Sequence, residues 1–436
     1  MSEGERSLAL AFDWLPDAAQ DRHPGLTWLV VWCFDVTIES LFRREAIYPP
    51  DYELDPGTLV VSNHQRDSDV PLLSTAICRR DGHRFLGPLP VHAVREDLFR
   101  EGILGDLFAD WPRPLPQLLG RVPVRWLFQA IRGEPVRRIR EFTLGEAVAA
   151  LVDAGFGGAR LGEIFNPRAI RRLGARLGEL PATLAELDDR RLGALRRSFW
   201  GLRWLRREAL RQLEPEFEAT IERQLGRLAA CLASGRVVYF APEGTLSPSG
   251  EFRRVRDGAW RLFQLAQAPP LLPCALSYDP LAPGRLRAIV RIGEPVARPE
   301  AGDRQHFDAL VRHEILALYP VTPSHLVARF LAAGPREFTT AECADWMRAA
   351  TAEIRGAGLT LDPLVERQPA GELAEERLGW LERKRLVRAR AGRWRSAWRT
   401  DAAPGWSSPA GEVAYLERSL GELAGLAPGL GERLVP

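Results

Sequence analysis

The chain contains a single lysine, Lys384, and only five cysteines among its 436 residues. Its other basic residues are arginines, and a guanidinium can bind phosphate or carboxylate through two parallel hydrogen bonds. The cysteines are odd in number and scattered without zinc-ligand spacing, which argues against a disulfide framework and against a zinc site. We therefore expect reduced cysteines and no metal.

Long apolar runs are also missing. A bilayer-spanning helix needs about 18 or more consecutive apolar residues, and no segment reaches that length. The first residues lack the basic start and the apolar core of a signal peptide. The formal net charge of +2 is close to neutral and gives no strong field for nucleic acid. These features favour a cytoplasmic protein, and the length predicts two or three domains.

Two segments are amphipathic when they are drawn as helices. Residues 28–42 combine a tryptophan-containing apolar run with acidic residues on one face. Residues 192–213 place leucines roughly opposite arginines that include Arg196 and Arg211. Each pattern is typical of a helix that packs on the core, and also of a helix that lies on a membrane surface. Both interpretations stay open; the second predicts peripheral contact with the inner face of the cytoplasmic membrane.

Strand and helix signals alternate in two parts of the chain, residues 43–126 and residues 216–319. This alternation predicts an α/β fold with a mixed, largely parallel sheet flanked by helices. Residues 127–215 between them are rich in arginine, leucine and alanine, which predicts a helical insert.

We expect three parts along the chain. An N-terminal amphipathic helical lead covers residues 1–42, and the α/β domain with its insert covers residues 43–319. A helical C-terminal domain covers residues 320–436. Within it, residues 373–395 indicate a helix followed by a basic hairpin, which also fits a winged-helix unit.

His64 follows an apolar strand expected over residues 59–62, and Asp69 comes five residues later. An unperturbed histidine titrates near pH 6.5, so it is largely neutral and basic in the cytosol. A carboxylate can fix its tautomer and stabilise the imidazolium that forms, as in a serine-protease triad. Residues five apart do not share a helix face, so such a pair requires a turn. The pattern predicts a general base with an orienting carboxylate, for which Asp67 competes; a surface histidine near an aspartate is the alternative.

Glu243, Gly244 and Thr245 follow a second strand, which is expected over residues 236–241. Glycine adopts a positive φ without penalty and lets a ligand approach the backbone closely. The threonine adds a hydroxyl. The segment predicts a polar binding loop, with an ordinary strand-exit loop as the alternative.

In this order the two motifs resemble those of the glycerolipid acyltransferases, the family of 1-acyl-glycerol-3-phosphate acyltransferases. Three further segments are similar to blocks of that family: residues 120–125, 273–276 and 292–295. The resemblance implies O-acyl transfer from acyl-CoA or acyl-carrier protein to the hydroxyl of a glycerol-phosphate or lyso-phospholipid acceptor. It implies that His64 is the base and Asp69 its orienter, with no metal and no cofactor beyond the thioester co-substrate.

The resemblance also implies an acceptor site. Residues 243–245 match the third block, and Arg125 corresponds, one position early, to the arginine that binds the acceptor phosphate. The chain departs from the family at Leu246, where the third block has arginine. Arg254, in an arginine cluster on the next turn, can supply the missing phosphate contact.

Two other functions stay open. A non-catalytic lipid-binding or regulatory module could use the same fold, although it would not need His64, Asp69 and Glu243. An acyltransferase for a lyso-lipid without phosphate would explain the leucine at position 246. A nucleic-acid partner is disfavoured by the near-neutral net charge.

Overall fold

The computed structural model describes residues 24–50, 52–78, 80–81, 84–85, 87–99, 128, 131–137, 141–188, 199–297, 302–398 and 402–436. The chain divides into two compact units. One combines Met1–His92 with Ala230–Pro436, and the other is Ala93–Ala229.

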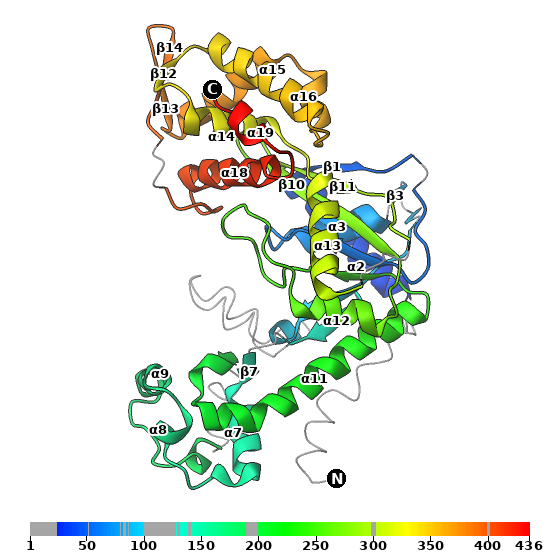
Figure 1. The fold of residues 1–436 in the computed structure, drawn as a ribbon, viewed down its shortest axis with the longest axis vertical. Coiled ribbons are helices and arrows are strands. Elements are labelled where there is room, and N and C mark those ends of the chain that lie inside the picture. The colour runs from blue at the N-terminus through cyan, green and yellow to red at the C-terminus, as the bar shows by residue number, and fades with distance from the viewer. Residues whose placement is uncertain are drawn as a thin grey trace. The chain divides into compact units, whose positions relative to one another are not determined.

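Within the described residues, seven strands form one sheet (Figure 1). Its order is β1 (Phe42–Ile47), β11 (Leu286–Ile292), β10 (Leu271–Asp279), β2 (Leu59–Ser62), β9 (Val238–Phe240), β5 (Val91–Arg95) and β6 (Gly133–Val136). The β10–β11 pair is antiparallel, whereas β1–β11, β2–β10, β2–β9 and β5–β9 are parallel. The predicted α/β class with a mixed, largely parallel sheet is confirmed.

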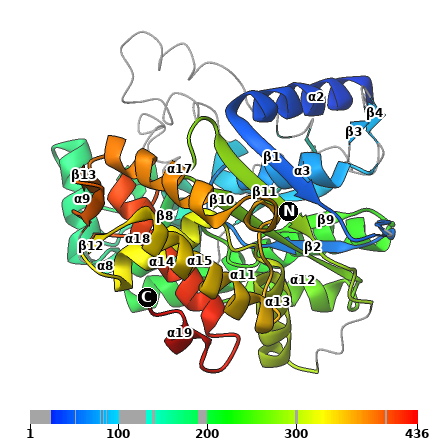
Figure 2. The ribbon, with the colours of Figure 1, turned by 90° about the horizontal axis from the view of Figure 1, so that it is seen from above.

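Helices cover both faces of this sheet. Figure 2 shows α2 (Pro24–Leu41) and α3 (Asp69–Cys78) on one side, and α12 (Asp257–Leu265) and α13 (Arg304–Leu318) on the other. Every residue of β2 and β10 is buried. Two covered faces explain why these strands are continuous apolar runs rather than alternating ones.

Most predicted elements are present with shifted ends. The strand expected over residues 59–62 is β2, and the helix after it begins at Asp69. The strand expected over 236–241 is shorter. The sequence of residues 96–108 is typical of a helix. Residues 96–99 form the 3-10 turn η1 (Glu96–Phe99), and residues 100–108 lie outside the described residues. A short hairpin of β3 (Arg80–Asp81) and β4 (Arg84–Phe85) follows α3.

The Ala93–Ala229 unit is mainly helical and has its own apolar core, in which Phe142, Phe165 and Trp200 are almost fully buried. The helical segments of its described residues include α7 (Leu144–Leu151), the π turn η2 (Val152–Phe156), α8 (Leu161–Ile164), α9 (Pro167–Leu177), the 3-10 turn η3 (Ala185–Asp188) and most of α11 (Arg207–Ala233). The short strands β6, β7 (Glu141–Thr143) and β8 (Phe199–Gly201) are additions that the sequence did not indicate.

The basic helix predicted over residues 192–213 is wrong in its middle. β8 pairs antiparallel with β7, and the 3-10 turn η5 (Leu202–Trp204) follows it. Aromatic residues favour strands and glycine weakens helices, so the local preference of Phe199–Gly201 outweighs the amphipathic pattern. Arg211 lies in α11, and Arg196 lies outside the described residues. The membrane-surface interpretation requires a continuous helix over residues 192–213, and residues 199–204 of this segment do not form one.

The C-terminal region is helical with a small sheet. Its elements are α14 (Pro323–Ala333), β12 (Glu337–Phe338), α15 (Thr340–Gly356), α16 (Pro363–Arg367), α17 (Ala370–Arg383), β13 (Val387–Arg390), β14 (Arg393–Ser396), α18 (Pro409–Ala424) and α19 (Leu430–Arg433). The hairpin β13–β14 follows α17 as predicted, and β12 pairs with β14. The winged-helix assignment itself stays a prediction.

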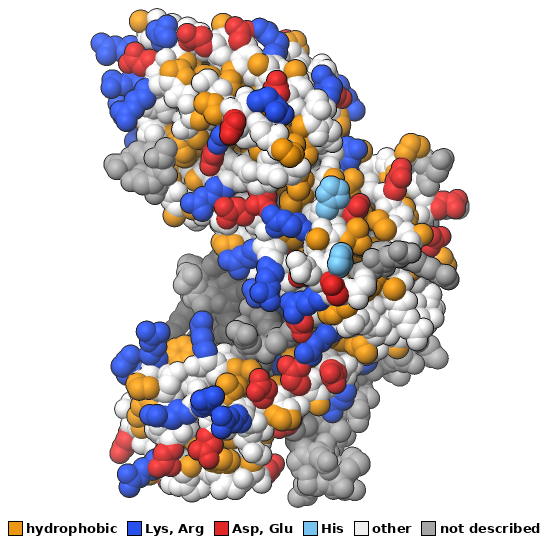
Figure 3. Space-filling view, in the orientation of Figure 1, with side chains coloured by type: hydrophobic (Ala, Val, Ile, Leu, Met, Phe, Trp, Pro, Cys, Tyr) orange, Lys and Arg blue, Asp and Glu red, His pale blue; other side chains and the backbone are white. Residues whose placement is uncertain are grey.

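The hairpin is basic and the helix before it is acidic. Figure 3 shows Lys and Arg side chains gathered at the upper left, over β12, β13 and β14. Arg388 and Arg390 are exposed there. The exposed side chains of α17, however, include Glu372, Glu375 and Glu376, which would repel a phosphate backbone.

Buried ion pairs join the C-terminal region to the sheet. Arg377 of α17 donates to Asp279 at the end of β10 at 2.6 Å, and both side chains are almost fully buried. Arg287 of β11 donates to Asp362 at 2.8 Å. Removing one partner of a buried pair leaves an uncompensated charge, so these contacts fix the C-terminal region on the sheet.

Candidate active site

The turn between β2 and α3 brings His64 and Asp69 together. The backbone N–H of Asp69 donates to the carbonyl of Arg66 at 3.0 Å, which reverses the chain before α3 begins. Asp69 is fully buried, and its Oδ2 lies 3.2 Å from His64 Nδ1. The same oxygen accepts the backbone N–H groups of Gln65 at 2.5 Å and Arg66 at 2.8 Å. The carboxylate therefore fixes both the ring and the turn that carries it.

This contact determines which ring nitrogen of His64 is free. A carboxylate only accepts hydrogen bonds, so in the neutral ring Nδ1 carries the proton and Nε2 keeps its lone pair. Nε2 has no hydrogen-bond partner in the described part of the chain, and the side chain is 16% exposed. Asp67, the competing carboxylate, is exposed to solvent. The geometry is that of a base with its accepting nitrogen open.

Tyr278 completes the surroundings of Asp69. Its hydroxyl, which comes from β10, donates to Asp69 Oδ1. Burial, together with the neighbouring carboxylate, raises the pKa of Tyr278 well above its usual value, so the phenol stays a neutral donor. Sequence reasoning missed this residue because it lies far from His64 along the chain.

Asn63 anchors the exit of β2 to the neighbouring strand. Its side-chain amide donates to the carbonyl of Leu276 and accepts the N–H of Leu276, both at 2.8 Å. Backbone N–H groups near Asn63 or Gly244 are candidates, from the sequence, for donors to the oxyanion of a tetrahedral intermediate. The N–H of Gly244 is already bonded to the carbonyl of Ala241 at 3.0 Å, which removes that candidate.

Glu243 is fully buried beneath the His64 turn. Its Oε1 accepts the backbone N–H of His64 at 3.0 Å. Its Oε2 accepts the Ser247 hydroxyl at 2.6 Å and the backbone N–H of Arg253 at 2.8 Å. Burial raises the pKa of the Glu243 carboxyl, and these three hydrogen bonds oppose the rise. The carboxylate thus ties the loop after β9 to the backbone of the predicted base.

The other predicted acceptor residues differ in exposure. Gly244 has a positive φ of 63°, as its place in the motif required, and is exposed. Thr245 is half-buried, and its hydroxyl accepts from the Arg253 guanidinium at 3.3 Å. Arg254 is exposed in the same loop. Arg125 lies outside the described residues.

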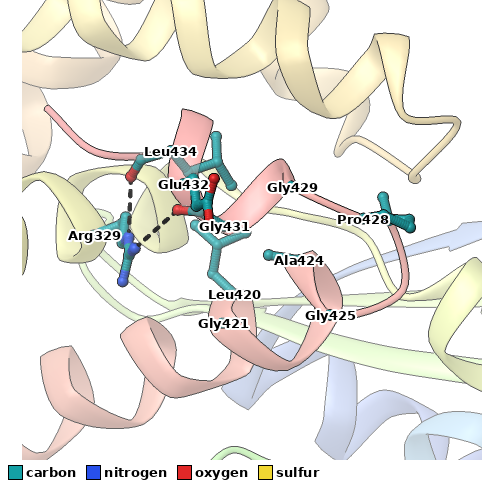
Figure 4. Close-up of a pocket in the computed structure, with 11 residues that line it drawn as sticks. Arg329, Leu420, Gly421, Ala424, Gly425, Pro428, Gly429, Gly431, Glu432 and Leu434 are labelled. Carbon is teal, nitrogen blue, oxygen red and sulfur yellow. Dashed lines mark hydrogen bonds between the residues drawn. The ribbon is translucent and has the colours of Figure 1, made fainter.

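A cavity of about 410 Å³ lies elsewhere, in the C-terminal region (Figure 4). Arg329 lines it but donates to the carbonyl of Leu434 at 3.1 Å and to Glu417 at 2.6 Å. Its charge is already compensated, and no residue of the His64 site lines this cavity. Among the described residues, no group of three or more His, Cys, Asp or Glu side chains is placed to hold a metal ion.

No protein-family model and no curated protein matches this chain. Among solved structures, the chain is similar to the 1-acyl-sn-glycerophosphate (LPA) acyltransferase PlsC from Thermotoga maritima. The two are 13% identical, with a TM-score of 0.35, over 72% of this chain and 85% of that chain. This likeness assigns no role to any residue here.

Proposed function

We propose that this protein is an O-acyltransferase that moves a fatty acyl chain from an acyl thioester to the hydroxyl of a glycerol-phosphate or lyso-phospholipid acceptor. The observation that carries the proposal is the His64–Asp69 pair, with Nδ1 held by a buried carboxylate and Nε2 open. The donor is acyl-CoA or acyl-carrier protein.

The chemistry follows from that geometry. His64 Nε2 takes the proton of the acceptor hydroxyl as its oxygen attacks the thioester carbonyl carbon. Asp69 stabilises the imidazolium that forms. When the tetrahedral intermediate collapses, the carbon–sulfur bond breaks and the proton on Nε2 passes to the departing thiolate. The acceptor hydroxyl is the nucleophile, so no acyl-enzyme is needed.

The loop after β9 would hold the acceptor. Gly244 and Thr245 present backbone and hydroxyl groups, and Arg254 supplies a cation for a phosphate. Arg125 is proposed for the same phosphate from the resemblance alone. Because Glu243 is enclosed by its three donors, we propose that it acts on the acceptor through the loop it holds.

We also propose that α2 contacts a membrane surface. No helix in the described part of the chain is both long enough and apolar enough to cross a bilayer. One face of α2 docks on the protein, where buried Asp35 pairs with Arg44 at 2.7 Å. The other face exposes Leu29 (54%), Trp32 (38%) and Val36 (40%), spaced for one helical stripe. Sedimentation with vesicles would test this contact: a Trp32→Ser, Val36→Ser variant should bind less than wild type, and equal binding would contradict it.

The test of the activity is a transfer assay. Purified protein is given labelled acyl-CoA or acyl-carrier protein with a panel of lyso-phospholipids, glycerol 3-phosphate and uncharged lyso-lipids. Transfer to a phosphate-bearing acceptor supports the proposal. Transfer to an uncharged acceptor alone would favour the phosphate-free alternative, and binding without any transfer would favour a non-catalytic lipid-binding module.

A further inference from the structure

Arg66, in the middle of the His64 turn, packs its guanidinium on aromatic rings and not on a carboxylate. Its guanidinium carbon lies 3.9 Å from the ring centre of Trp406 and 5.0 Å from that of Tyr278. No carboxylate of the described residues is within ion-pair distance of the guanidinium, and its Nε is shielded from solvent with no hydrogen-bond partner. Burial lowers the pKa of Arg66, although Tyr278, Glu412 and Asp69 oppose that change.

Two more polar groups without a hydrogen-bond partner belong to the aromatic cluster on which Arg66 packs. The Trp406 ring packs on the Tyr415 ring with centres 4.3 Å apart. Trp406 Nε1 and the Tyr415 hydroxyl are both buried without a hydrogen-bond partner, and Tyr415 is fully buried. The guanidinium and the indole can only donate, so both lack an acceptor that the described residues do not supply. Buried polar groups in proteins are normally hydrogen-bonded, and exceptions indicate a missing partner.

The carboxylates that act on the charge of Arg66 are not in contact with its guanidinium. The Asp69 carboxylate is occupied by four donors, from His64, Gln65, Arg66 and Tyr278. Glu412 is half-buried near Arg66 and Lys384, and burial raises its pKa to about 6. Near neutral pH most of it is ionised, but it makes no contact ion pair with Arg66. A water molecule could accept from one of these donors, whereas a phosphate could accept from several and also pair with the guanidinium.

We propose that Arg66, Trp406 and Tyr415 form a phosphate subsite next to the catalytic base. A phosphate accepts hydrogen bonds from several directions and pairs with an arginine fork, which suits one cation and two neutral donors. The proposal rests on the acyltransferase function and adds to it. The C-terminal region completes the site, and the subsite takes a phosphate group of either the acceptor or CoA.

The binding test uses the full chain and does not depend on activity. Calorimetry measures the affinity for inorganic phosphate, glycerol 3-phosphate and CoA. Arg66→Ala should weaken binding by roughly tenfold to a hundredfold, the effect of losing a charge-assisted contact. Trp406→Phe and Tyr415→Phe keep an aromatic ring and remove one donor, so each should weaken binding by about twofold to tenfold. Arg388→Ala, which removes an exposed arginine of β13, is the matched control and should leave affinity unchanged.

A second measurement separates binding from folding. Tyr415→Phe removes a hydroxyl that has no partner, so Tm in phosphate-free buffer should not fall. The rise in Tm that phosphate causes should be smaller than in wild type. A hydroxyl with a purely structural role would give the opposite pair of results.

The outcomes distinguish this proposal from the acyltransferase itself. Tightest binding of glycerol 3-phosphate assigns the subsite to the acceptor, and tightest binding of CoA assigns it to the donor. Wild-type affinity in Arg66→Ala, or no binding of any of the three compounds to wild type, overturns the subsite. If the protein binds phosphate in an Arg66-dependent way but transfers no acyl group, the anion site stands and the proposed acyltransferase function is contradicted.

Discussion

The turn after β2 and the loop after β9 each contain a buried carboxylate, and the two are used differently. Asp69 accepts from the side chain of His64, whereas Glu243 accepts from the backbone of His64. The loops are also joined by the N–H of Ser247, which donates to the carbonyl of His64 at 2.7 Å. One carboxylate thus orients the ring, and the other holds the main chain that presents it. The two motifs thus use a buried carboxylate for different contacts, one with the ring of His64 and the other with its main chain.

The largest effect is expected for Asp69→Asn. An amide can present its NH₂ group to Nδ1 and select the wrong tautomer, so kcat should fall by roughly 10²–10⁴-fold. Asp67→Asn, an exposed carboxylate in the same turn, is the control. Equal losses in the two variants would contradict the role of Asp69.

Glu243→Gln tests the other half of the comparison. The side-chain NH₂ group of the introduced glutamine would face N–H or O–H donors and could not accept from them. The free energy of unfolding should therefore fall by about 1–3 kcal/mol. The His64 backbone should shift, and kcat should fall by roughly tenfold to a hundredfold. Urea unfolding and steady-state kinetics measure the two effects. Glu251→Gln, exposed in the same loop, should change neither, and an unchanged Glu243→Gln protein would rule out the positioning role.

Tyr278→Phe should have a smaller effect. Asp69 would lose one of its donors, so its carboxylate would be held less firmly beside the His64 ring. We expect a loss in kcat of a few-fold, typical of one neutral hydrogen bond. Tyr48→Phe, whose hydroxyl donates to the carbonyl of Ala76 at 2.8 Å, is the control. A kcat for Tyr278→Phe equal to that of wild type would contradict the role of this contact.

Substitution of His325 should have the smallest effect on catalysis. It should nevertheless change the pH dependence of stability measurably. This ring is fully buried, and burial lowers its pKa to about 3. The unfolded chain takes up the proton near pH 6.5, so stability should fall as the pH drops from that value towards 3. His325→Asn should make the free energy of unfolding less dependent on pH between 7 and 4.5. His306→Asn, whose side chain is 75% exposed, is the control, and parallel curves for wild type and His325→Asn would contradict the account.

Sequence reasoning found the parts of the site that are local in the chain. The apolar runs before His64 and Glu243 predict the ends of β2 and β9, and the five-residue spacing predicts the turn. It missed Tyr278 and Trp406 because their contacts with the turn depend on strand order and on docking of the C-terminal region. The helix predicted over residues 199–206 is wrong for a different reason. An amphipathic pattern contains no information on strand pairing, such as that of Phe142 with Trp200.

The most direct test of the central claim is the turnover of His64→Ala. The variant removes the open Nε2 and leaves the backbone hydrogen bonds of the turn to Asp69 and Glu243 in place. Its kcat for acyl transfer should fall by roughly 10²–10⁴-fold while its circular dichroism spectrum and Tm stay close to those of wild type. Wild-type turnover by the folded His64→Ala protein would contradict the assignment of His64 as the base.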